Sequence, residues 1–119
     1  MTSKKKYSFP EDKFVLYKRL VSTIPVVELK GATMPYTSWH GHMFSFLDAE
    51  GHLGLRLPLA AREEFMLRHD TQLCMAHGRV LKEYVFVPDQ VFENFDLIRT
   101  YFAVSFGYVG QLKPKSSTK

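Results

Sequence analysis

Alternating hydrophobic and polar positions predict a sheet over the middle of the chain. Leu53, Leu55 and Leu57 alternate with polar or small residues, which is typical of a strand with one buried face. Similar runs predict further strands at residues 26–30, 34–39, 42–47, 73–76 and 81–87. Turn-forming residues such as the Asp48–Gly51 stretch separate these runs. Residues 81–87 are apolar on both predicted faces, so the pattern does not say which face is buried.

Helical spacing marks three other segments, and proline opens or closes each of them. The predicted helices run from Pro10 to Pro25, from Pro58 to His69 and from Asp89 to Leu112. Proline suits the first turn of a helix, and it excludes the residue before it from the helical region. Strands and helices in this order indicate an α+β domain.

The last predicted helix carries two hydrophobic stripes. Burying both sides of a helix takes more partners than one two-layer domain offers. We therefore predict a homodimer contact through the second stripe, which consists of Leu97, Tyr101, Val104 and Tyr108. The alternative is that the first helix and the tail cover this stripe, or that its tyrosines lie at the surface.

The chain of 119 residues has the size of one domain, and 45% of its residues are hydrophobic. We predict a folded body at residues 9–112, a disordered basic tail at 1–8 and a second disordered tail at 113–119.

The net charge is +4, but six lysines lie in the tails, and the body from Tyr7 to Leu112 carries ten cations against twelve carboxylates. This distribution does not favour a nucleic-acid interface on the body.

Three cations lie close together in the strand region. Arg56, Arg79 and Lys82 are the candidate nucleic-acid-binding residues, because a folded basic patch is what binds phosphates. The alternative is an ordinary solvated sheet face that Glu50 and Glu83 partly neutralise. Nucleic acid is therefore a partner that the sequence allows but does not favour.

No catalytic constellation is present, so we predict no catalytic residues, no cofactor and no metal. His40, His42 and His52 lack a recognised zinc spacing. Cys74 with His77 as its base is a candidate nucleophile, but a structural cysteine is the simpler interpretation. A single cysteine excludes an internal disulfide. With no signal peptide and no apolar run long enough for a membrane span, we predict a cytoplasmic protein that does not bind membranes.

Three stretches resemble the N-terminal domain of the TfoX/Sxy family and the related YjbR-like fold. They are residues 42–47 (His-Met-Phe-Ser-Phe-Leu), residues 53–58 (Leu-Gly-Leu-Arg-Leu-Pro) with the following Arg62-Glu-Glu, and residues 78–88 (Gly-Arg-Val-Leu-Lys-Glu-Tyr-Val-Phe-Val-Pro). The resemblance covers roughly residues 12–112. It implies a two-layer α+β fold with one antiparallel sheet and helices packed mainly on one face. The implied order is helix, three strands, helix, two strands, helix.

The family is associated with competence regulation in bacteria, and it supplies no catalytic residues to transfer. The resemblance therefore implies a stand-alone TfoX N-terminal-like domain that acts as a non-enzymatic regulatory or protein-interaction module, either as a homodimer or with another protein partner. Two alternatives stay open: a weak nucleic-acid-binding regulator, and an enzyme or metal-binding protein that uses the histidines or Cys74.

Overall fold

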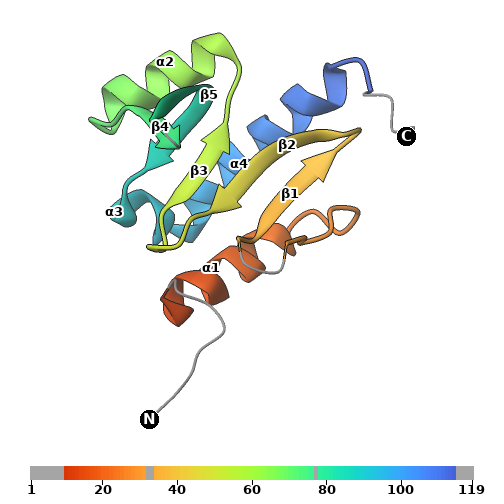
Figure 1. Cartoon of the computed structure of the whole chain (residues 1–119), viewed down its shortest axis with the longest axis horizontal. Helices are drawn as coiled ribbons and strands as arrows, with labels where there is room; N and C mark the ends of the chain where they lie inside the picture. Colours follow the sequence, from red (N-terminus) through yellow and green to blue (C-terminus); the bar gives the residue numbers. More distant parts are fainter. Residues whose placement is uncertain (1–9, 32–33, 77, 115–119) are drawn as a thin grey trace.

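The computed structural model describes residues 10–31, 34–76 and 78–114 of the chain. Its elements follow the predicted order, with the last helix in two pieces (Figure 1). The bounds are α1 Glu11–Val21, β1 Tyr36–Trp39, β2 His42–Leu47, β3 Leu53–Arg56, α2 Leu59–Arg68, β4 Leu73–Ala76, β5 Arg79–Val87, α3 Asp89–Phe92 and α4 Phe95–Gln111. The predicted α+β fold is confirmed.

The five strands form one antiparallel sheet in the order β1-β2-β3-β5-β4. Figure 1 shows α4 crossing behind this sheet, with α1 along its lower side and α2 at its upper left. The helices therefore pack mainly on one face, as the resemblance implies. Within the described residues, no helix is long and apolar enough to cross a membrane.

The core lies between the sheet and the helices. Leu53, Leu55 and Leu57 are fully buried, which confirms the face that the alternation predicts for β3. Phe65 of α2 and Phe102 of α4 are also fully buried and belong to the same cluster. Burying side chains of this size provides about 1.5–3 kcal/mol each, so this one cluster supplies much of the stability.

A β-bulge in β2 turns two consecutive side chains toward the helices. Ser38 pairs with Met43 and Thr37 pairs with Ser45, so Phe44 is an extra residue on β2. The Phe44 ring lies 5.4 Å from the ring of Phe102, and both Phe44 and Ser45 are fully buried. An extra residue lets neighbouring side chains share a face, which strict alternation would forbid.

Residues 26–30 do not form the strand that the sequence predicts. Only Lys30 makes a bridge, to Tyr36 of β1. The N–H of Val27 instead donates to the carbonyl of Ile24 at 2.9 Å, in the turn that follows α1. The helix ends at Val21, and the N–H groups of Thr23 and Ile24 donate to the carbonyls of Leu20 and Val21 in the tight turns before Pro25.

The last predicted helix is two helices. The chain leaves helical geometry at Asn94, which has φ −90° and ψ 91°. Its side chain accepts a hydrogen bond from the N–H of Leu97 at 3.3 Å and so caps α4. Asparagine is a preferred N-cap residue because its side chain satisfies an otherwise unpaired helix N–H.

The predicted tails lie mostly outside the described residues. None of residues 1–8 is described, and the second tail is described only at Lys113 and Pro114. The carbonyl oxygen of Lys113 lies 2.8 Å from Nε2 of His42. This contact joins the end of α4 to the start of β2.

Candidate binding surface on the open sheet face

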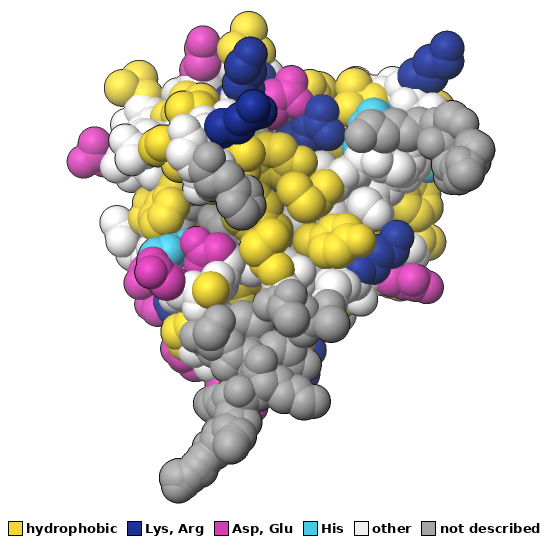
Figure 2. Space-filling view, in the orientation of Figure 1, with side chains coloured by type: hydrophobic (Ala, Val, Ile, Leu, Met, Phe, Trp, Pro, Cys, Tyr) yellow, Lys and Arg dark blue, Asp and Glu magenta, His cyan; other side chains and the backbone are white. Residues whose placement is uncertain are grey.

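The sheet face turned away from α4 carries apolar side chains. We call this surface the open face and define it by Met43, Phe46, Leu81, Tyr84 and Phe86. Figure 2 looks onto the open face and shows hydrophobic side chains gathered over the centre of the sheet. Antiparallel sheets with one uncovered face usually present polar residues there, so an apolar open face requires an explanation.

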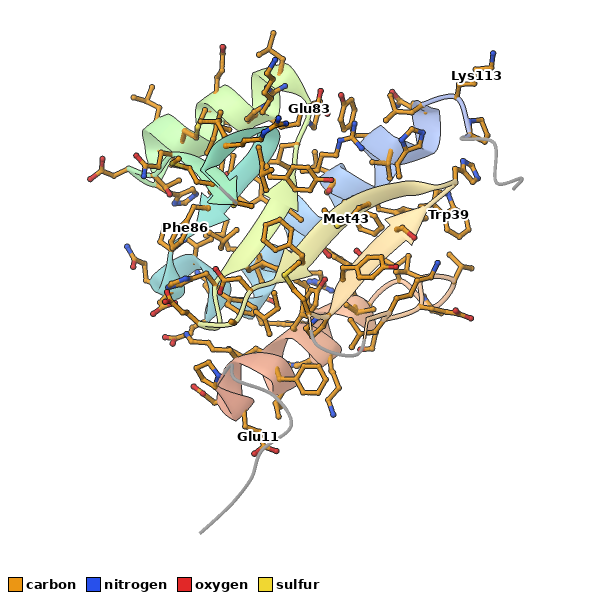
Figure 3. All side chains as sticks on the ribbon, viewed as in Figure 1. Glu11, Trp39, Met43, Glu83, Phe86 and Lys113 are labelled. Carbon is orange, nitrogen blue, oxygen red and sulfur yellow. The ribbon has the colours of Figure 1, made fainter. Side chains whose placement is uncertain are left out.

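The centre of the open face is hollowed. The hollow has a volume of about 580 Å³, and Met43, Phe46, Leu81 and Phe86 are among its lining residues. Figure 3 shows Met43 on β2 and Phe86 on β5, with β3 between these strands. A concave apolar surface of this kind takes up apolar groups of a partner, because burial removes them from water.

Charged residues form one rim of the hollow. Asp48 accepts hydrogen bonds from the backbone N–H groups of Glu50 and His52, both at 2.9 Å. Nδ1 of His52 lies 3.3 Å from Oδ2 of Asp48, and the His52 ring lies 4.7 Å from that of Phe86. Asp48 therefore holds the turn between β2 and β3 in shape and keeps a carboxylate beside the apolar surface.

The opposite end of the sheet is held to α4 by a polar cluster. Nε of Arg56 donates to Glu83 at 2.7 Å, and the hydroxyl of Tyr108 on α4 donates to the same carboxylate at 3.0 Å. Burial alone would raise the pKa of Glu83. The hydrogen bonds from Arg56 and Tyr108, with the positive charges of Arg56 and Arg62, instead hold this pKa below its usual value.

The three candidate nucleic-acid residues are not equivalent in the structure. Arg56 is paired with Glu83, and its Nη1 donates to the carbonyl of Met43. Arg79 and Lys82 are exposed, and neither makes an ion pair within the described residues. Two free cations remain of the predicted patch, so its role in nucleic-acid binding stays a prediction.

Most of the predicted dimer stripe contacts other parts of the same chain. Tyr101 is 9% exposed and its ring meets that of Phe65 edge-on at 4.8 Å. Leu97 packs against the core, and Tyr108 binds Glu83. Val104 is 38% exposed and is the most accessible side chain of this stripe. A dimer through α4 stays a prediction that now depends mainly on Val104.

The candidate metal and thiol residues are dispersed. His40 stacks on Trp39, while His42 and His52 have the partners described above. Within the described part of the chain, no group of three or more His, Cys, Asp or Glu side chains could hold a metal ion.

Cys74 lies beside the hollow rather than in a reactive setting. It is buried, and burial, helped by the charge of Asp48, raises the pKa of its thiol to about 12. At neutral pH the thiol therefore keeps its proton, which disfavours nucleophilic attack. His77, the suggested base, lies outside the described residues.

The apolar character of the open face was not predicted from the sequence. The apolar residues on both predicted faces of strand 81–87 were the available signal. The pattern would place Leu81 with the buried Val85, but the register of β5 with β4 shifts between these positions, and Leu81 lines the hollow instead. A shift of this kind depends on the neighbouring strand and cannot be read from local periodicity.

Comparisons with protein-family models, with curated proteins and with solved structures gave no match.

Proposed function

We propose that this chain is a TfoX N-terminal-like domain that acts as a non-enzymatic regulatory or protein-interaction module, and that it binds its partner through the open face. The apolar hollow on the uncovered side of the sheet carries the proposal. Apolar surfaces rimmed by polar residues mark protein-interaction sites, because leaving them in water is unfavourable. The element order of one helix, three strands, a helix and two strands before the final helices supports the family assignment.

The arrangement of polar groups also favours binding over catalysis. The clearest ion pair near the face, Arg56 with Glu83, is satisfied by the chain itself, and Tyr108 completes it. The Cys74 thiol keeps its proton at neutral pH. These groups stabilise the surface without leaving an activated nucleophile or base on it.

Site-specific photo-crosslinking in the native cell tests the proposal. A photoreactive phenylalanine analogue at Phe86 should form a discrete adduct with another polypeptide chain. The same analogue at Val15 serves as the control, because Val15 is 54% exposed but lies on α1. Adding Met43→Lys to the Phe86 variant should abolish the adduct, since a charge in the hollow opposes burial. No adduct at Phe86, or an equal one at Val15, would contradict the proposal.

The open face is poorly suited to nucleic acid. The centre of the face is apolar and one rim is acidic, whereas phosphate binding requires several unpaired cations together. Titration with a short DNA duplex at low salt should show no binding by the wild-type protein. Binding that weakens steeply with salt and is lost in Arg79→Ala/Lys82→Ala would favour the nucleic-acid alternative.

A further inference from the structure

One end of the open face is acidic. The turn between β2 and β3 carries Asp48 and Glu50, and both residues line the hollow. Oε1 of Glu50 lies 3.7 Å from Nδ1 of His52, and the Glu50 side chain is 81% exposed. Its charge is therefore available to a partner that covers the face.

The end of the sheet far from this turn carries two exposed cations. Arg79 and Lys82 lie in the first part of β5, and both are exposed. Strand β5 pairs with β3 from Leu53 opposite Val87 to Arg56 opposite Tyr84, so the first residues of β5 extend past the end of β3 that is far from the acidic turn. Figure 2 shows Lys and Arg side chains along the top of the molecule, with acidic side chains among them, and acidic side chains with a His on its left side.

This charge distribution is complementary to itself. In a two-fold dimer the same surface is used twice, so each acidic end must meet some part of the same face on the other copy. A two-fold axis that runs across the strands brings the acidic end of each copy to the basic end of the other. An axis parallel to the strands would place Asp48 and Glu50 against their own copies, and like charges at an interface are strongly unfavourable.

We propose that two copies of this chain pack open face against open face, with Asp48 and Glu50 of each copy beside Arg79 and Lys82 of the other. This inference rests on the proposed function and names the partner of the same surface. The two sheets would form a sandwich about 10 Å thick. The methionines near the hollow suit this packing: Met34 is 46% and Met75 63% exposed, and methionine adapts readily to irregular apolar space.

Two other surfaces could form a dimer instead, and each has a residue that tests it. Leu67 is 86% exposed on α2, beside a second apolar groove that Met66, Leu73 and Val80 also line. Val104 is the exposed residue of the α4 stripe. The charged residues near them, Glu64 with Arg68 on α2 and Asp96 with Arg99 on α4, are paired within a single helix.

Sedimentation velocity on lysine variants distinguishes these surfaces. The wild type should be mostly dimeric at a protein concentration of about 100 µM, which is well above a dimer Kd of roughly 10 µM. Met43→Lys should weaken the dimer by at least about tenfold, whereas Leu67→Lys and Val104→Lys should not change it. A monomeric wild type, or loss of the dimer in either control, would overturn the inference. Circular dichroism confirms that each variant is folded.

Charge reversal tests the orientation separately. Glu50→Lys and the double variant Arg79→Glu/Lys82→Glu should each dimerise more weakly than the wild type. Asp48 is left unchanged because it shapes the turn. An equimolar mixture of the two variants should associate more tightly than either alone, since the basic end of one then meets the acidic end of the other. A mixture no tighter than its components would contradict the proposed arrangement.

The crosslinking experiment at Phe86 separates this inference from the proposed function. An adduct with twice the chain mass of 13.8 kDa supports the dimer. An adduct with a different protein, together with a monomeric wild type, would overturn the dimer and leave the proposed function standing. Absence of any adduct would contradict both.

Discussion

The ring of Phe46 on β2 lies directly over Gly54 on β3. A Cβ atom added to Gly54 would come within 2.6 Å of Cε2 of that ring. The absence of a side chain at this one position lets a large aromatic side chain lie flat across the sheet, and Phe46 is only 7% exposed on a face that no helix covers. The open face is therefore a packed surface and not a set of loose apolar side chains.

Replacing Gly54 by alanine should disturb this packing. The new methyl group must displace the Phe46 ring, so we expect the free energy of unfolding to fall by about 1–3 kcal/mol in urea titrations. Gly107→Ala is the control, because nothing lies near its added Cβ and it is within helix α4. That variant should be more stable than the wild type by about 0.5–1 kcal/mol. Unchanged stability in Gly54→Ala would show that the ring is not constrained.

Three buried hydroxyl groups in the core depend on one another. Oγ of Ser45 lies 2.6 Å from the hydroxyl of Tyr17 and 2.5 Å from that of Thr37. Ser45→Ala should lower the free energy of unfolding by about 1–3 kcal/mol, because it leaves buried polar groups without a partner. Tyr17→Phe in the Ser45→Ala background should then cost less than it does in the wild type, since the lost partner is no longer needed. Strictly additive effects would contradict this coupling.

Acid should weaken the attachment of α4 to the sheet through Glu83. The folded-state pKa of Glu83 lies below its unfolded value. The stabilisation is therefore fully present above the ordinary glutamate pKa of about 4.3 and is lost as the pH falls through the lower, folded-state pKa. Glu83→Gln should reduce the loss of stability between about pH 5 and pH 3. Glu63→Gln, which removes an exposed carboxylate on α2, is the matched control for the loss of one negative charge.

The single cysteine should react slowly in the folded protein. Cys74 is 6% exposed, and burial raises the pKa of its thiol to about 12. A disulfide reagent that consumes thiolate at pH 8 should therefore label the native protein far more slowly than the urea-unfolded chain. The chain has one cysteine, so the signal needs no deconvolution. Equal rates would mean that β4 opens readily.

Hydrophobic patterns along the chain predicted the features that depend on residues close together in sequence. The alternation in β3 identified its buried leucines. The break between α3 and α4 was not predicted, although Asn94, which caps α4, is a residue type that favours a helix start. The bulge at Phe44 could not be predicted, because it exists only through the pairing of β2 with β1. The contact between Phe65 of α2 and Tyr101 of α4 has no local signal in the sequence either.

The open face was hidden for a related reason. Apolar side chains on Tyr84, Val85 and Phe86 resemble a strand buried on both sides. Which side the helices cover depends on long-range packing, and that side proves to be the one with Val85. The remaining apolar side chains then form a surface and not a second core.

Methyl NMR on methionine-labelled protein tests the central claim most directly. Met34 and Met43 line the hollow, whereas Met66 lies on α2 and packs against the core. We expect the methyl signals of Met34 and Met43 to shift on dilution while that of Met66 stays in place. The signals should stop responding to dilution in the Arg79→Glu/Lys82→Glu variant. Methyl signals of Met34 and Met43 that are independent of concentration would contradict the open face as the contact between two copies.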